Sequence, residues 1–528
     1  MRQLWFLLIA LFILSCTKKE IKDIQADSFR ISILPVVNPA FNQYKLTGTL
    51  DVHQTAGNIE YGLVVGKTLN PVVEHEQVFK VGSSSSSIDF TKVIANLDTG
   101  FTYYVRAYGK SSTSTEYSAN QAIGKLAPKL SLNTTSLQYG QLFSVFTNFY
   151  ISDTENLPEV QLNNTPVKLI GGVGSGVNSA SLTFIPPPTL SPGTYTLSVK
   201  VGNISISYPT QLTLLEGTWS QLEYLLPRDY SGVASIPDRY VINNWIYTNQ
   251  FGNPVSPSSF SRYNYKTGET QTLKALPAEL LPRGAAIVQI GNDLHFMGGE
   301  LIATGAANRP VTKSYQVYHI TNDTWTQEPD IPAAPRSNAA VMQVGNRLYY
   351  GLGTDPSITS GGGYYTGLND IWVCDLNTKK WTQLQDFPGK GGFSRAYFIV
   401  NAKLYVTGGN GDNGTQVKET WCYDPGTNQW SRKADYPGQG WINLSTFSIG
   451  GYGYVGLGET ASYNSYFGRN LYPNFYKYNA TTDKWTEVSN FGGNLVQPFV
   501  GNDGSNILIG AGMDASSVPS RALLVFKP

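Results

Sequence analysis

Charged side chains are scarce in this sequence of 528 residues: only 14% are Asp, Glu, Lys or Arg, and the 38 basic residues nearly balance the 37 acidic ones. A formal net charge of +1 provides no field to attract phosphate backbones, which argues against nucleic acid as a partner. Histidine is rarer still, with four residues, and His295 and His319 share one repeat unit while the others lie far upstream. A multi-histidine metal centre is therefore not expected. GxSxG, HExxH and phosphate-loop motifs are also missing, so we expect neither metal nor cofactor.

Glycine and aromatic residues, in contrast, are abundant. There are 53 Gly, aromatics make up 12% and apolar residues 41% of the chain, a composition typical of turn-rich β structure rather than of disorder or coiled coil. The length exceeds that of an ordinary domain about threefold, so several all-β domains are expected.

The first 15 residues have the pattern of a secretory signal: one Arg, an apolar stretch too short to span a bilayer, then a small residue. Cys16 follows, and Ile13-Leu14-Ser15-Cys16 resembles the lipobox of bacterial lipoproteins, which implies lipidation at Cys16. Lys18-Lys19-Glu20 resembles the export tags of Bacteroidetes-type surface lipoproteins. We expect an outer membrane lipoprotein at the cell surface or facing the periplasm, with residues 16–29 as a tether and the lipid as its only membrane attachment.

Only two cysteines remain after Cys16. Cys374 lies seven residues before Trp381, whereas Cys422 lies eight before Trp430, so their side chains should face opposite sides of a sheet. We predict two buried free thiols rather than a disulfide.

The C-terminal part contains an internal repeat. Trp325, Trp381, Trp430 and Trp485 recur at intervals of 56, 49 and 55 residues, each after a polar turn, and glycines end an upstream strand in each unit. Such periods are typical of propeller blades. The glycine pairs, followed by Tyr and Trp seven residues apart in three of the units, resemble the kelch repeat, which implies that Tyr and Trp pack between blades.

The ends of the repeat region predict how the ring closes. Trp219 lies in a fourth strand with no preceding three, and the chain stops at a third strand, ALLVFKP, with no fourth after it. The strand at Trp219 should therefore complete the last blade. With Thr270 in place of Trp in blade one, residues 216–528 are predicted to form a six-bladed kelch-type β-propeller.

Two immunoglobulin-like β-sandwich domains should precede the propeller. Residues 30–126 alternate apolar and polar, and LDTGFTYYVRAYG resembles a fibronectin type III strand with Tyr103 as its tyrosine corner and Val105 and Ala107 pointing inward. Residues 127–215 resemble an IPT/TIG domain. Both would act as spacers between the lipid and the propeller.

The two faces of the predicted propeller differ. Its hairpin turns on one face are minimal, whereas the loops from second to third strands are long: 249–261, 300–313, 354–369 and 459–474. Because function concentrates on loops held by a rigid scaffold, we predict binding on this long-loop face.

Several groups should meet at the mouth of the axial channel on that face. Glu300 and Glu459 directly follow the glycines that end second strands and are the candidate catalytic residues. Arginines just before or within innermost strands either hold an anionic ligand or brace the blades, and aromatic residues either stack on sugar rings or pack in the loops. These ligand-binding candidates are Arg228, Arg283, Arg336, Arg395, Trp441, Tyr364, Tyr365 and Tyr466.

Three functions remain open at this point. The first is a lipid-anchored surface protein that binds a glycan or a protein partner. The second is a mutarotase or epimerase similar to kelch enzymes that act on sialic acid, with channel Arg holding a carboxylate and Glu300 or Glu459 moving a proton. The third is a structural role in envelope assembly.

Overall fold

The computed structural model describes residues 28–40, 43–54, 57–95, 97, 102–124, 129–148, 158–171, 180–201, 204–222, 226, 240–250, 259–277, 284–301, 310–359, 365–390, 392–411, 416–439, 442–460, 470–491, 493, 495, 498–502, 505–510, 512 and 520–528. The signal sequence and Cys16 lie outside these residues. Within them the secondary structure is all β, and no helix is long and apolar enough to cross a membrane.

The N-terminal strands form two sheets around one core. The first sheet contains β1 (Ser28–Ile33), β3 (Gln43–Gln54), β2 (Val37–Ala40) and β6 (Ile88–Ala95). The second contains β5 (Gln77–Ser84), β4 (Ile59–Gly66), β7 (Thr102–Lys110), β8 (Thr115–Tyr117) and β9 (Gln121–Gly124). Tyr103, Val105 and Ala107 of β7 are buried in this core, which confirms the predicted inward face.

The next strands form three smaller sheets. Their members are β10 (Leu130–Leu132), β12 (Phe143–Thr147), β16 (Ala180–Phe184) and β15 (Leu169–Gly171); β14 (Thr165–Val167), β13 (Glu159–Leu162), β18 (Leu197–Val201) and β19 (Ile204–Ser207); and β11 (Ser136–Leu137), β20 (Leu212–Leu214) and β17 (Gly193–Tyr195). The chain divides into two compact units, one of Met1–Asn133, Ser144–Thr183 and Leu197–Pro209, the other of Thr134–Phe143, Phe184–Thr196 and Thr210–Pro528.

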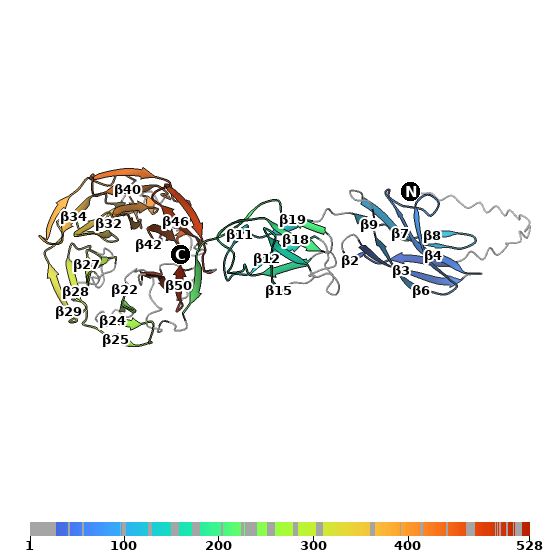
Figure 1. Cartoon of the computed structure of the whole chain (residues 1–528), viewed down its shortest axis with the longest axis horizontal. Coiled ribbons are helices and arrows are strands. Elements are labelled where there is room, and N and C mark those ends of the chain that lie inside the picture. Colours follow the sequence, from blue (N-terminus) through green and yellow to red (C-terminus); the bar gives the residue numbers. More distant parts are fainter. Residues whose placement is uncertain are drawn as a thin grey trace, which may run out of the picture. The chain divides into compact units, whose positions relative to one another are not determined.

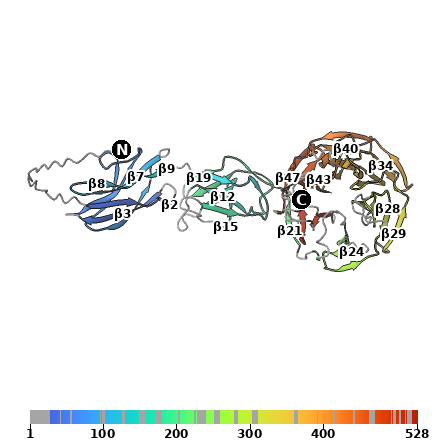
Figure 2. The same cartoon turned by 180° about the vertical axis from the view of Figure 1, so that it is seen from behind.

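In the second unit, six four-stranded antiparallel sheets follow one another around a ring (Figure 1, and from behind in Figure 2). We number them sheets 1 to 6 and give their strands in order.

Sheet 1 has β22 (Tyr240–Ile242), β23 (Trp245–Gln250), β24 (Ser259–Asn264) and β25 (Thr270–Thr272); sheet 2 has β26 (Ala286–Ile290), β27 (Asp293–Met297), β28 (Tyr315–His319) and β29 (Thr324–Glu328). Sheet 3 has β30 (Ala340–Val344), β31 (Arg347–Gly351), β34 (Ile371–Asp375) and β35 (Lys380–Gln383); sheet 4 has β37 (Ala396–Val400), β38 (Lys403–Thr407), β40 (Thr420–Asp424) and β41 (Gln429–Lys433). Sheet 5 has β42 (Ser445–Ile449), β43 (Tyr452–Gly456), β46 (Phe475–Asn479) and β47 (Lys484–Val488); sheet 6 has β48 (Phe499–Asn502), β49 (Ile507–Gly510), β50 (Leu523–Lys527) and β21 (Thr218–Gln221).

Sheet 6 joins the two ends of the ring region. Strand β21 pairs antiparallel with β50, which places Trp219 opposite Phe526 with ring centroids 4.9 Å apart. This is the pairing that the incomplete first and last repeats predict. Trp219 also donates its indole N–H to the carbonyl of Ser489, which follows sheet 5, at 2.8 Å.

Four of the recurring tryptophans, Trp219, Trp325, Trp430 and Trp485, bind the backbone that follows the preceding sheet. Trp325 of sheet 2 donates its indole N–H to Lys274 O at 3.1 Å, and Trp485 of sheet 5 donates to Ala434 O at 2.9 Å. Both acceptors lie just after the outermost strand of the preceding sheet. The tyrosine seven residues before Trp485, Tyr478, packs on Tyr405 of sheet 4 with ring centroids 5.3 Å apart, which confirms the predicted packing of aromatic residues between sheets.

Cys374 and Cys422 are buried free thiols, as predicted. Cys374 packs in the core shared by sheets 2 and 3, whereas Cys422 packs in the core shared by sheets 4 and 5. Burial raises the pKa of the Cys374 thiol to about 11, so this thiol stays protonated and unreactive near neutral pH.

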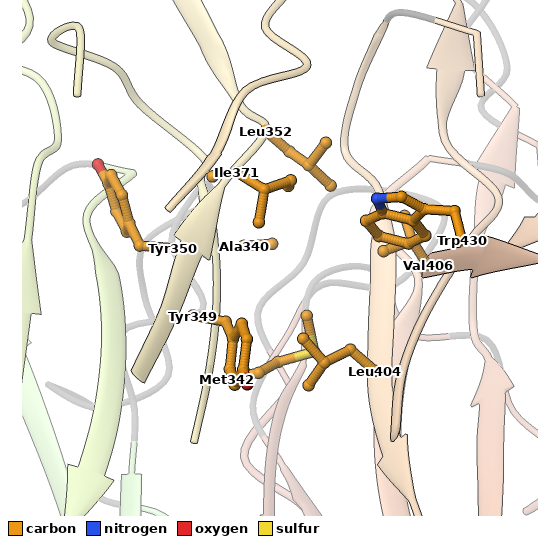
Figure 3. A pocket seen from close by; sticks show the side chains of 10 residues that line it. Ala340, Met342, Tyr349, Tyr350, Leu352, Ile371, Leu404, Val406 and Trp430 are labelled. Atoms are coloured by element: carbon orange, nitrogen blue, oxygen red, sulfur yellow. The ribbon is translucent and has the colours of Figure 1, made fainter. Parts of the chain in front are cut away.

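A small apolar cavity lies between sheets 3 and 4. Met342 and Tyr349 of sheet 3 lie across it from Leu404 and Trp430 of sheet 4 (Figure 3). Its volume is about 10 Å³, room for one water at most. It is a packing gap and not a ligand site.

Candidate functional site

One backbone turn recurs where the second strand of a sheet ends. A left-handed residue follows the strand at Gly298, Leu352, Gly408 and Leu457, with φ between 53° and 67°. Two residues after each of these comes a polar side chain. We call these four the rim residues: Glu300, Thr354, Asn410 and Glu459.

The rim residues lie beside the segment that leads into the innermost strand. Thr354 bridges Ser337, Asn410 pairs with Phe393, and Glu459 bridges Ile442. The residue after each partner is again left-handed: Asn338, Ser394 and Asn443, with Gly284 at the corresponding position of sheet 2. The repeated geometry therefore holds four polar side chains at equivalent positions on four successive sheets.

Sheets 2 and 3 contact each other beside the rim residues. Asn338 N donates to Gly284 O at 2.7 Å, and Gly299 N donates to Arg336 O at 2.9 Å, which join sheet 3 to sheet 2. Two rim residues also begin short ribbons of the long loops: β32 (Thr354–Thr359) pairs with β33 (Tyr365–Gly367), and β44 (Glu459–Thr460) pairs with β45 (Asn470–Leu471). Asn410 begins β39 (Asn410–Gly411), which pairs with β36 (Gly392–Phe393), the strand just before the innermost strand β37.

Both predicted carboxylates belong to this set. Glu459 is only 6% exposed, and its Oε1 accepts a hydrogen bond from Asn443 Nδ2 at 2.6 Å. Glu300 is half-buried; burial raises the pKa of its carboxyl, and a hydrogen bond from the Ser337 side chain offsets part of this effect. A carboxyl that is harder to ionise is a better proton donor near neutral pH.

Thr354 and Asn410 were not predicted from the sequence, although both are buried at the same level. In the described part of the chain, Asn410 Oδ1 has no hydrogen-bond partner. The glycines before positions 300 and 459 pointed to the two glutamates, and aligning the left-handed residue across the repeats would have pointed to the other two.

Arg336 has a bracing role. Its side chain is fully buried, and its two terminal nitrogens contact Asp370 Oδ1 at 2.7 Å and Oδ2 at 2.6 Å. The guanidinium also donates to Leu352 O at 3.0 Å and Ala334 O at 2.9 Å. A ligand in solvent cannot reach this group, so the expectation of a ligand-binding Arg336 gives way to the bracing alternative.

The pKa of the Asp370 carboxyl is set by burial and by its contacts with Arg336 and Trp372. Burial raises its pKa, but the hydrogen bonds and charge of Arg336, helped by the indole N–H of Trp372, outweigh burial, and the net pKa is lowered. The pair is therefore ionised at neutral pH.

Arg395 makes a similar brace one sheet further on. Its Nη1 donates to Gly408 O at 2.6 Å, the carbonyl equivalent to Leu352 O, and its Nη2 donates to Lys390 O. The same turn of strand and loop is thus held by an arginine in both sheets.

The side chains of the remaining predicted binding residues are not among those that the structure describes. Arg228, Arg283, Trp441, Tyr364 and Tyr466 lie outside the described residues, and Tyr365 is described as the first residue of β33, by its backbone only. No group of three or more His, Cys, Asp or Glu side chains suited to a metal ion occurs among the residues that the structure describes.

Comparison with known proteins agrees with this repeat geometry. Residues 284–501 match the KLHDC2/KLHL20/DRC7 Kelch-repeats domain family. This segment is a kelch-repeat β-propeller domain. The four-stranded sheets described above are consistent with kelch blades.

The curated relative of the kelch domain is distant. The Kelch-like protein terF of Aspergillus terreus (strain NIH 2624 / FGSC A1156) is 25% identical over 222 residues, which cover 38% of this chain and 44% of that protein. The match thus spans less than half of the relative's length. The solved structure of YjhT has 11% identity and a TM-score of 0.46, and the match covers 57% of this chain and 99% of that one.

Proposed function

We propose that this protein binds carbohydrate at the long-loop face of a six-bladed kelch propeller. The propeller is held away from the outer membrane by a lipid on Cys16 and by two spacers, a fibronectin type III-like domain (30–126) and an IPT/TIG-like domain (127–215). The protein acts at the cell surface or facing the periplasm, with a glycan as its partner and no cofactor.

One observation supports this proposal: four polar rim residues occupy equivalent positions, two residues after the left-handed turn that follows the second strand, in four successive sheets. Glu300 and Glu459 supply carboxylate oxygens, and Thr354 and Asn410 supply neutral polar groups. Sugar hydroxyls are donors that such oxygens accept, and a rigid backbone holds the acceptors in place before binding.

The experiment compares Glu459→Gln with Glu328→Gln in the whole mature chain on a glycan array followed by calorimetry. Hydrogen bonds to a charged group contribute about 1.5–3 kcal/mol, so Glu459→Gln should weaken binding at least tenfold. Glu328 lies at the end of the outermost strand β29 and pairs with Lys379, and its substitution should leave binding unchanged.

If Glu459→Gln and Glu328→Gln bind glycan with equal affinity, the rim residues are not part of the binding site. If no glycan binds the parent chain, a protein partner on the same face, or a structural role in the envelope, becomes the better explanation.

The raised pKa of the Glu300 carboxyl favours a second function, a carbohydrate mutarotase or epimerase. A half-buried carboxyl whose pKa is raised gives up its proton less readily to water and is better suited to share it with a ring oxygen. Proton NMR of anomer interconversion tests this: Glu300→Gln should abolish acceleration and keep binding. A parent chain that accelerates no interconversion would rule out the enzyme.

A further inference from the structure

The contact between sheets 2 and 3 departs from a pattern that other sheets of the ring share. In three other pairs of adjoining sheets, an aromatic residue at the middle of a second strand packs on an aromatic residue in the third strand of the next sheet. Their ring centroids are between 5.3 and 5.9 Å apart in the pairs Tyr349–Tyr423, Tyr405–Tyr478 and Tyr454–Phe526. His295 and Cys374 occupy the equivalent positions of sheets 2 and 3, so a histidine and a thiol replace two aromatic rings there.

His295 is buried in this contact among uncharged groups. Only 6% of its surface is exposed. Within the described part of the chain its ring makes one hydrogen bond, which joins Nδ1 to the hydroxyl of Tyr315 at 2.8 Å. Tyr315 packs with Cys374 in the core that sheets 2 and 3 share. Because burial raises the pKa of both the Tyr315 phenol and the Cys374 thiol, neither carries a negative charge at neutral pH that could pair with a protonated His295.

The carboxylates nearest to His295 each contact another basic side chain. Asp293, on the same strand, lies 3.0 Å from Nδ1 of His319 on β28. Glu328 of β29 lies 3.0 Å from Nζ of Lys379, in the turn after β34 of sheet 3. Strand β26, on the other side of β27, carries no titratable side chain. Burial, together with the charges of Lys379 and His319, outweighs the attraction of the two carboxylates and lowers the pKa of His295 to about 4.

Protonation of His295 places an unpaired charge in this contact, and water can solvate that charge only if the two sheets separate. We propose that mild acid opens the contact between sheets 2 and 3 while the other contacts of the ring stay closed. Residues 216–528 hold no histidine outside sheet 2, which restricts this response to one place. Backbone hydrogen bonds from Asn338 to Gly284 and from Gly299 to Arg336 join the inner ends of the two sheets, so the third and fourth strands are the parts that move apart.

The two buried thiols report on two different contacts of the ring. Cys374 lies between sheets 2 and 3, and Cys422 lies between sheets 4 and 5. In the whole mature chain carrying Cys16→Ala they are the only thiols. Dithiodipyridine, a disulfide that reacts with thiols in acid as well as at neutral pH, labels each thiol when its contact opens. Peptide mass spectrometry measures the two labelling rates, and each is divided by the rate for glutathione at the same pH.

The labelling rate of Cys374 should rise about 100-fold between pH 6.5 and about 4, because the opened contact takes up a proton over this range and the closed contact does not. Cys422 should stay protected. His295→Gln removes the titrating ring, keeps an acceptor for the Tyr315 hydroxyl and should abolish most of the rise. The control His53→Gln, at an exposed side chain upstream of the ring, should leave the rise unchanged.

Three results would overturn the proposal. Equal labelling of Cys374 and Cys422 in acid would mean that the ring unfolds as one unit, and no rise at Cys374 would mean that the contact stays closed. A rise that persists in His295→Gln would assign the opening to another group. If His295→Gln does not fold, His295→Tyr introduces the residue found at the equivalent positions 349 and 405 and should remove the rise in the same way. None of these measurements involves a glycan, so they are independent of the proposed binding function.

Discussion

Replacing Arg336 distinguishes a role in stabilising the fold from a role in binding a ligand. Arg336→Ala leaves the Asp370 carboxylate, whose side chain is 22% exposed, without its counterion. Breaking a buried pair by removing one partner costs about 3–5 kcal/mol, and partial exposure of Asp370 places the expected loss near the lower end, about 3 kcal/mol. The carbonyls of Leu352 and Ala334 also lose their donor.

Urea unfolding of the whole mature chain measures this loss. Every tryptophan beyond the leader lies at or after Trp219, so intrinsic fluorescence reports the ring. Replacing both partners, as Arg336→Met with Asp370→Leu, removes the charges together and should stay within about 1 kcal/mol of the parent.

The pH dependence of the unfolding free energy tests the same Arg336–Asp370 pair in a second way. The lowered pKa of Asp370 means that its contribution is complete above the ordinary carboxyl pKa of about 4 and is lost as pH falls through the lowered value. The parent should therefore lose its advantage over Arg336→Ala only in acid, where Asp370 is protonated. An Arg336→Ala chain that unfolds at the parent's midpoint but no longer binds glycan would refute the bracing role.

Three further outcomes are expected. Trp219→Ala should lower the unfolding free energy by about 3 kcal/mol, because its ring packs on Phe526 of the closing sheet 6 and on Phe475 of sheet 5; an unchanged urea midpoint would contradict closure through β21. Burial lowers the pKa of His295 to about 4, so stability should fall by about 3 kcal/mol as pH drops from 6.5 to 4, since only the unfolded chain takes up the proton. His295→Gln should flatten that slope in acid titrations of stability, whereas His53→Gln, at an exposed side chain, should not. Cys16→Ala should move the protein from the membrane to the soluble fraction, and unchanged fractionation would count against a lipid anchor.

The sheets of the ring could be predicted because their determinants are local. A Trp near the start of five of the six outermost strands, and glycines at the ends of the second strands of sheets 2 to 5, are visible in a window of some 50 residues. Even the closing pair of Trp219 with Phe526 followed from counting strands, since the first unit has only a fourth strand and the last unit has only three strands.

The site was harder to predict because its side chains are satisfied by residues distant in sequence. Arg336 and Asp370 are 34 residues apart, so the sequence left open whether the guanidinium holds a ligand or a neighbour. Arg283 and Arg336 each follow a proline, which makes their positions look equivalent in the sequence. Counted from the left-handed residues Gly284 and Asn338, however, the two positions differ by one residue. The repeat could have indicated the position of Asn410, but its unsatisfied acceptor is recognised only once its surroundings are known.

The pairing of β21 with β50 makes the order of chain synthesis matter. Thr218 emerges from the ribosome, or from a secretion pore, long before its partner Lys527. Until then sheet 6 lacks its members and the backbone groups of β21 stay open to other strands. Bringing these ends together requires closing a loop of about 300 residues, an entropic cost that grows only slowly with length. A chain truncated before β50 would therefore keep complete early sheets yet expose two unpaired edges, which makes partial products targets for proteases and aggregation.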